Sequence, residues 1–132
     1  MYKSFTISDI RDIELLVTNI NYEANCIHAD EKKRKGRTLS QVVDMVRQGK
    51  VAEQWLIENH SFTQARLKFH DLVNSDREFV EVKAYSYGDI FSEFIHRDLA
   101  KYRDSTWSKA KWYILFNYID GIYYHKATIK IK

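Results

Sequence analysis

The stretch that decides the fold is residues 70–83, which read HDLVNSDREFVEVK. The polar cluster at residues 74–77 is typical of a turn, and the residues on either side alternate between apolar and polar, as they do in β-strands. If residues 75–77 form a three-residue loop, the numbers of paired residues sum to 152, and Asp71 lies opposite Glu81. The pattern therefore predicts a β-hairpin that brings these two carboxylates together.

The charged residues of this hairpin share one of its faces. Lys83 follows Glu81 by two residues and points the same way, whereas Val80 and Val82 point to the opposite face, which we expect to be the core. Two carboxylates and an ammonium group then lie side by side, and the backbone carbonyl of Val82 offers another oxygen. Mg²⁺ is a hard cation that prefers oxygen ligands. We therefore expect Asp71, Glu81 and the Val82 carbonyl to hold a magnesium ion.

Asp71 followed by the triplet EVK at residues 81–83 resembles the signature of the PD-(D/E)xK, or restriction-endonuclease-like, nuclease superfamily. A similar triplet, EKK at residues 31–33, lies in a polar run without apolar alternation, so the context rather than the spacing favours residues 81–83. A preceding helix that carries Glu53 is similar to the helix that supplies an auxiliary acidic residue in that superfamily. His70 stands where the name of the superfamily has proline, a position that varies widely.

This resemblance implies a fold and a reaction. The fold would be α+β with a restriction-endonuclease-like core, a central mixed β-sheet flanked by helices and N-terminal helices before the catalytic hairpin. The reaction would be hydrolysis of phosphodiester bonds in DNA with Mg²⁺, for which Mn²⁺ could substitute. Asp71 and Glu81 would hold the metal, and Lys83 would orient the attacking water and stabilise developing charge. Glu53 would bind a second metal or orient the ligands of the first.

The last half of the chain shows a narrower resemblance, to the small PvuII-type homodimeric restriction enzymes. It rests on the spacing from Asp71 to Glu81 and Lys83, and on the stretch AKYR at residues 100–103, which precedes a strand rich in aromatic residues. The resemblance says nothing about residues 1–48. A two-fold homodimer would present one active site to each strand of a duplex.

The rest of the chain predicts helices and strands around the hairpin, in one domain that spans residues 1–132. Apolar spacing and capping residues predict a helix over 7–21 capped by Ser8, a helix capped by Thr38 and ended by Gly49, and helices over 51–59 and 90–102. The turn signal DG at residues 120–121 predicts a hairpin of two strands over 111–120 and 122–132. Residues 29–37 are too polar to pack, so we expect an exposed loop there.

Basic residues concentrate in two zones that flank an acidic centre. Residues 31–50 and 97–132 each carry a net charge of +5, whereas residues 51–96 carry −4. Cations that follow a phosphate backbone are expected in a protein that binds nucleic acid. We therefore expect DNA as the partner, with phosphate contacts from Lys33, Arg34 and Lys35 in the first zone and from Lys101, Arg103 and Lys109 in the second.

Several classes of site and location are disfavoured by composition. Cys26 is the single cysteine, which excludes an internal disulfide and a zinc site built from several cysteines. The five histidines lack the spacing of zinc ligands, and His70 should face away from Asp71 because neighbours in a strand point to opposite faces. No run of about 18 apolar residues is present. We therefore expect no membrane partner and a cytoplasmic location, in a bacterial or phage-infected cell.

Two other classes of function remain open. The chain could be a small basic nucleic-acid-binding module without catalysis, in which Glu81 and Lys83 pair on a surface hairpin and contribute at most about 1 kcal/mol. It could also be a protein-interaction module that uses exposed aromatic residues. Removal of metal with a chelator separates the nuclease from the nucleic-acid-binding module, because an enzyme then loses cleavage whereas a binding module keeps its affinity.

Overall fold

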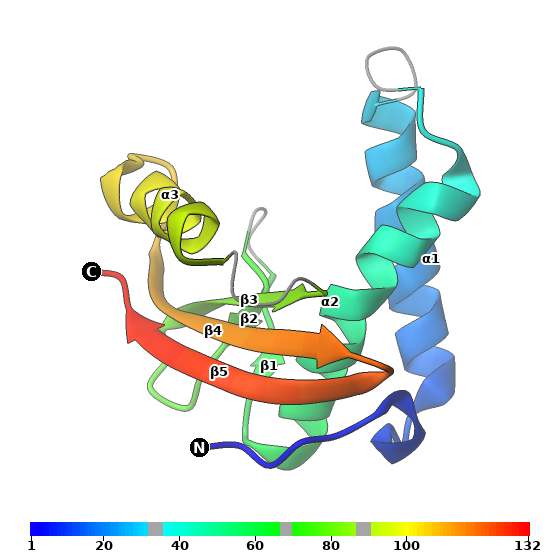
Figure 1. The fold of residues 1–132 in the computed structure, drawn as a ribbon, viewed down its shortest axis with the longest axis horizontal. Helices are drawn as coiled ribbons and strands as arrows, with labels where there is room; N and C mark the ends of the chain where they lie inside the picture. The colour runs from blue at the N-terminus through cyan, green and yellow to red at the C-terminus, as the bar shows by residue number, and fades with distance from the viewer. Residues whose placement is uncertain (32–35, 67–69, 87–90) are drawn as a thin grey trace.

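The computed structural model describes residues 1–31, 36–66, 70–86 and 91–132. In chain order its elements are the short 3-10 helix η1 (Ile7–Asp9), helices α1 (Ile13–Glu31) and α2 (Leu39–Asn59), strands β1 (Thr63–Gln64), β2 (Leu72–Val73) and β3 (Phe79–Tyr85), helix α3 (Phe91–Asp104), and strands β4 (Ala110–Ile119) and β5 (Ile122–Lys130). The fold is therefore α+β, as the sequence predicts (Figure 1).

The described strands form one mixed sheet in the order β1-β2-β3-β4-β5. β1, β2 and β3 are antiparallel neighbours, β3 and β4 are parallel, and β5 returns antiparallel to β4. A parallel pair requires a crossover connection, and α3 lies in the segment that connects β3 to β4. β3 therefore occupies the centre of the sheet, with the shorter strands on one side and the long β4–β5 hairpin on the other.

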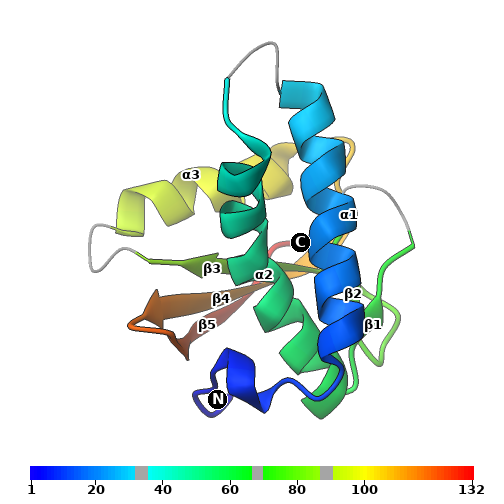
Figure 2. The same cartoon turned by 90° about the vertical axis from the view of Figure 1, so that its right-hand side faces the viewer.

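Helices cover both faces of this sheet (Figures 1 and 2). Along β4, Ile114 and Phe116 join the larger hydrophobic core, which also contains the buried residues of α1 and α2. Tyr113 and Leu115 point the other way and join a smaller core with Tyr102 of α3. The alternation of a strand thus divides its side chains between two helical layers. Within the described residues, no helix is both long and apolar enough to span a bilayer.

The first long helix begins later and ends later than the sequence pattern predicts. Thr6 caps η1 with a reciprocal capping box to Asp9, which uses the polar residues at 6–9 in a separate 3-10 turn, so the prediction that Ser8 caps a helix over 7–21 is wrong. α1 starts at Ile13 and continues to Glu31, which also shortens the loop expected over 29–37. The loop prediction fails at its start because helical structure continues beyond the apolar stripe that contacts α2.

The second helix is continuous where the sequence predicts two. Thr38 caps α2 as expected, with a reciprocal bond to Gln41. Gly49, however, does not end the helix, which runs on to Asn59. Buried Val46 and Val51 lie on either side of the glycine, so packing against the core offsets the roughly 1 kcal/mol cost of a glycine inside a helix.

The first hairpin has the predicted register, and the second turns at the predicted residues. In the first, Leu72 pairs with Val80 and Val73 with Phe79, so paired numbers sum to 152. In the second, residues 120 and 121 both adopt positive φ angles, of 51° and 81°, which is the conformation expected for the two central residues of a type I′ turn. The local turn chemistry therefore determined where both strand pairs begin.

Candidate active site

The hairpin of β2 and β3 brings Asp71 and Glu81 together. The backbone N–H of Val82 donates a hydrogen bond to Asp71 Oδ2 over 2.8 Å, so the Asp71 side chain reaches across to β3. Its carboxyl group also forms a hydrogen bond with the carboxyl group of Glu81. Val80 and Val82 are 1% and 4% exposed and lie in the core, as predicted. The sequence prediction that these carboxylates share a patch is thus confirmed.

Glu81 is a buried carboxyl group in an environment that opposes its ionisation. The residue is 3% exposed. Burial, then the neighbouring charge of Asp71 and the hydrogen bond to it, raise the pKa of Glu81 from 4.5 to about 9, although Lys83 acts in the opposite direction. Among the described residues, its buried Oε1 atom has no hydrogen-bond partner. A metal-free protein therefore carries Glu81 largely protonated at neutral pH.

Lys83 lies on the α3 side of the sheet, next to Tyr102. Its Nζ is 5.6 Å from the centre of the Tyr102 ring, and the two side chains share a hydrogen bond. Burial would lower the pKa of Lys83, but Tyr102, Asp71 and Asp98 together raise it above its ordinary value. Burial in turn raises the pKa of Tyr102 to about 12. Lys83 therefore remains an ammonium group and serves as a fixed positive charge beside the carboxyl pair.

Glu53, on α2, reaches the same patch but has a cationic partner of its own. Its side chain is buried, and its Oε1 is 3.3 Å from Nζ of Lys50, which also lies 3.4 Å from Oε2 of Glu23 on α1. Burial, and then Asp71, raise the pKa of Glu53 well above its ordinary value, against the effect of Lys50. Burial would lower the pKa of Lys50, yet Glu53, Glu23 and Asp71 raise it. Glu53 thus lies 3.3 Å from the Lys50 ammonium group, at a buried position that opposes its ionisation despite this cation.

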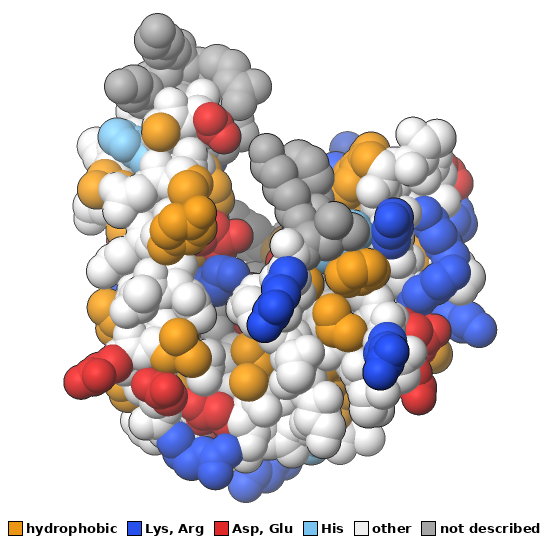
Figure 3. Space-filling model, turned by 180° about the vertical axis from the view of Figure 1, so that it is seen from behind, with side chains coloured by type: hydrophobic (Ala, Val, Ile, Leu, Met, Phe, Trp, Pro, Cys, Tyr) orange, Lys and Arg blue, Asp and Glu red, His pale blue; other side chains and the backbone are white. Residues whose placement is uncertain are grey.

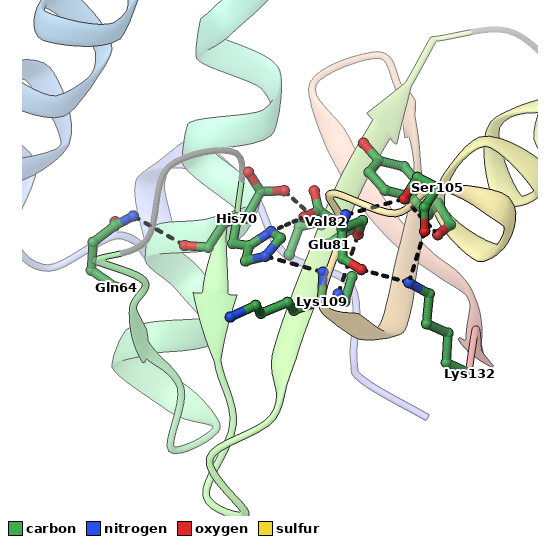
Figure 4. Close-up of polar contacts among 11 residues, drawn as sticks. Gln64, His70, Glu81, Val82, Ser105, Lys109 and Lys132 are labelled. Carbon is green, nitrogen blue, oxygen red and sulfur yellow. Dashed lines mark hydrogen bonds and ion pairs between the residues drawn. The ribbon is translucent and has the colours of Figure 1, made fainter.

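His70 does not face away from the site, so that expectation is wrong. Its side chain is 1% exposed, and its Nδ1 lies 3.4 Å from Oε1 of Glu81. Its Nε2 accepts the backbone N–H of Lys109 over 3.3 Å. Figure 4 shows the ring between these two residues, with one nitrogen directed towards each. The reason for the failure is that His70 precedes β2, which begins at Leu72, so strand alternation does not apply to it.

Three of the predicted phosphate contacts lie on the exposed surface near this patch. Lys101, Arg103 and Lys109 are all exposed, and Lys101 Nζ lies 5.8 Å from the centre of the same Tyr102 ring that Lys83 contacts. Figure 3 shows Lys and Arg side chains gathered on the α3 side of the molecule, and a hollow beside the arm formed by α1 and α2. Lys33, Arg34 and Lys35, the first predicted group, lie outside the described residues.

The donor set can be tested against a magnesium ion. Within the described part of the chain, no three His, Cys, Asp or Glu side chains are grouped so that they could hold a metal, so a cage of carboxylates is not preformed. The expected set needs two carboxylates and one backbone carbonyl. The adjacent carboxyl groups of Asp71 and Glu81, with Glu81 Oε1 not hydrogen-bonded among the described residues, fit a divalent cation, because it would neutralise the charge that burial makes costly.

Sequence reasoning missed three contributors to the patch. His70 was assigned to the wrong face, and the contact between Lys83 and Tyr102 depends on how α3 packs on β3, which no local pattern encodes. Lys50 is the contributor for which the sequence does contain a signal, because it precedes Glu53 by three residues, a spacing at which helical side chains meet.

Comparisons with known proteins do not identify this chain. No protein-family model, no curated protein and no solved structure matches it. The arguments about function therefore rest on the geometry of the patch and on the chemistry of its residues.

Proposed function

We propose that this protein is a Mg²⁺-dependent DNA endonuclease of the PD-(D/E)xK superfamily. The observation that carries the proposal is the contact between half-buried Asp71 and buried Glu81, whose neighbour Lys83 remains positively charged. A carboxyl pKa near 9 and a half-buried ammonium group are both costly to a folded protein, and such perturbed groups cluster at functional sites. A surface hairpin that merely pairs Glu81 with Lys83 does not account for the burial of Glu81.

The order of elements supports the same proposal. α2, β1, β2, β3, α3 and β4 follow the order of helix, mixed strands and second helix that the superfamily resemblance implies. Asp71 lies immediately before β2, Glu81 lies inside β3, and Glu53 lies on the preceding helix, as that resemblance also implies. We therefore propose the restriction-endonuclease-like core for this α+β fold.

Asp71, Glu81 and the backbone carbonyl of Val82 would hold the magnesium ion. When bound, the ion polarises the scissile phosphate and lowers the pKa of a water molecule to make it nucleophilic. Asp71 is already positioned for this role by the N–H of Val82. Glu81 loses its proton when it becomes a ligand, so metal binding competes with protons at this residue. Mn²⁺, which accepts similar oxygen ligands, would substitute.

The remaining residues of the patch have distinct roles in this proposal. Because the pKa of Lys83 is raised, its ammonium group donates hydrogen bonds and does not accept a proton. It would orient the attacking water and stabilise the negative charge that develops on the phosphate. Glu53 would orient the site rather than hold a second ion, since Lys50 already supplies the positive charge beside it.

DNA would approach along the exposed basic residues of α3 and the loop after it. Lys101 and Lys109 both lie close to residues of the patch, because Lys101 shares the Tyr102 ring with Lys83 and the backbone of Lys109 contacts His70. Arg103 is also exposed, and it pairs with Asp104 over 3.2 Å. Cleavage of both strands by such a small protein would require a two-fold homodimer. We place this activity in the cytoplasm of a bacterial or phage-infected cell.

The direct test is incubation of supercoiled plasmid with the protein and Mg²⁺. We expect nicked or linear product that disappears with a chelator, and a rate at least about 100-fold lower for Glu81→Ala and Lys83→Ala. Asp76→Ala, in the exposed turn of the same hairpin, and Lys111→Ala, at an exposed position of β4, are matched controls that should cleave normally. Unchanged cleavage by both active-site variants would reject the assignment.

A non-catalytic nucleic-acid-binding module is the second candidate, favoured by the exposed basic residues near α3. Fluorescence anisotropy with labelled duplex distinguishes the two functions. A binding module keeps the same affinity with Mg²⁺ or chelator and never changes the length of the duplex. An enzyme cleaves the duplex only with the metal, so product length decides between them.

A further inference from the structure

The buried side chain of His70 links the carboxyl pair to the loop that precedes β4, which carries Lys109. The ring lies between β3 and the loop that precedes β4, where one nitrogen faces Glu81 and the other accepts a hydrogen bond from the Lys109 backbone. The Phe79 ring packs against it with ring centres 4.4 Å apart. This arrangement leaves the imidazole little freedom to rotate.

The backbone contact determines the tautomer of the neutral ring. The N–H of Lys109 can only donate, so Nε2 of His70 must be the acceptor and carries no proton. The proton of the neutral ring then lies on Nδ1, which faces Oε1 of Glu81 at 3.4 Å. Among the described residues, that oxygen has no hydrogen-bond partner. His70 thus places its protonated nitrogen 3.4 Å from a buried carboxyl oxygen that has no hydrogen bond among the described residues.

We propose that His70 is a positioning residue that holds Glu81 and the Lys109 loop in fixed relation, and thereby couples metal binding to DNA binding. The proposal rests on the proposed nuclease function. Once Glu81 is ionised as a ligand, the Nδ1–H of His70 stabilises and orients the carboxylate, as donors to metal ligands commonly do. Through Nε2 the same ring positions Lys109, whose exposed side chain would contact a phosphate. Two sites that share such a rigid contact influence each other reciprocally.

Two substitutions separate the two contacts of the ring. In His70→Asn, the amide nitrogen takes the place of Nδ1 and the contact with Lys109 is lost. In His70→Gln, the longer side chain places its amide oxygen near the position of Nε2, and the contact with Glu81 is lost. Mn²⁺ affinity without DNA, measured by electron paramagnetic resonance, reports on Glu81. Duplex affinity in Ca²⁺, a hard cation that also takes oxygen ligands, reports on Lys109.

The two variants should change opposite properties. We expect His70→Gln to bind Mn²⁺ at least about 10-fold more weakly and to retain its affinity for duplex in saturating Ca²⁺. We expect His70→Asn to retain its Mn²⁺ affinity and to lose duplex affinity by about 3- to 10-fold, since the loop is no longer held. A residue with a merely structural role would weaken both properties together in both variants. That result, or wild-type binding by both variants, would overturn the proposal.

The wild-type protein provides a test that does not depend on the folding of a variant. Nitrogen-15 spectra of the labelled imidazole should show Nε2 unprotonated and Nδ1 protonated when the ring is neutral. A ring protonated at Nε2 instead would reject the assignment. If the wild-type protein never cleaves DNA, the nuclease proposal fails, whereas the tautomer and the Mn²⁺ result still decide the contacts of His70. If it cleaves and the variants do not diverge, only the role of His70 fails.

Discussion

Glu81→Gln should stabilise the metal-free protein while abolishing its activity. The glutamine amide has nearly the shape of a protonated glutamate and can still donate to Asp71, but it cannot ionise. In the folded protein the pKa of Glu81 is raised by burial and by Asp71 to about 9, against 4.5 as its ordinary value. Because the folded state has the higher pKa, the stability that Glu81 contributes is complete below pH 4.5. It is lost as the pH rises towards 9.

The size of the effect follows from that difference in pKa. Between pH 4.5 and pH 7 the unfolded chain releases the proton of Glu81 whereas the folded protein retains it, and each pH unit costs about 1.4 kcal/mol. At pH 7 the free energy of unfolding of the wild-type protein is therefore about 3 kcal/mol lower than its value at low pH, whereas the glutamine variant shows no such decrease. For a domain of this size such a difference corresponds to about 10 °C in Tm. At pH 4 the two proteins should be nearly equal in stability.

Urea unfolding and thermal melts at pH 4, 5.5, 7 and 8.5 measure this directly, with chelator present. Mg²⁺ at 100 times its Kd should then stabilise the wild-type protein by about 2.7 kcal/mol and leave Glu81→Gln unaffected. Glu14→Gln, on the exposed surface of α1, is the control and should follow the wild-type curve. Parallel pH curves for Glu81→Gln and the wild-type protein, or equal stabilisation of both by Mg²⁺, would refute the reasoning about this carboxyl group.

Three further predictions concern the neighbours of Glu81. Lys83→Met should lower kcat by about 10²- to 10³-fold even at saturating Mn²⁺, because the ammonium acts on the reaction itself; full recovery of kcat at high Mn²⁺ would contradict this. Lys50→Met leaves Glu53 buried without its cation, so the free energy of unfolding should be about 2 kcal/mol lower than in the wild-type protein at pH 8. At pH 5 the variant and the wild-type protein should differ much less in thermal melts. A loss of stability that does not depend on pH would be inconsistent with this. Substitution of Lys101 and Lys109 together by alanine should reduce the slope of log affinity against log salt for duplex DNA by about 2, and an unchanged slope would show that neither contacts phosphate.

The structure accounts for the uneven success of the sequence predictions. The register of the first hairpin could be deduced because a three-residue loop and strand alternation are local constraints, and the observed sum of 152 follows from them. The prediction that Gly49 ends a helix used an equally local signal and failed. Packing of Val46 and Val51 is worth more than the conformational cost of one glycine, and packing depends on the partner surface.

By itself the sequence determined the two hairpins, the α+β class and the shared face of Asp71, Glu81 and Lys83, because turn residues and two-residue periodicity act over a few positions. Only the tertiary structure placed His70 between Glu81 and the loop before β4. It likewise decided that Lys50 pairs with Glu53 in the interior and that Lys83 meets Tyr102 on α3. Those contacts join segments that are distant in sequence, and they depend on how the helices pack on the sheet and exclude water from between them.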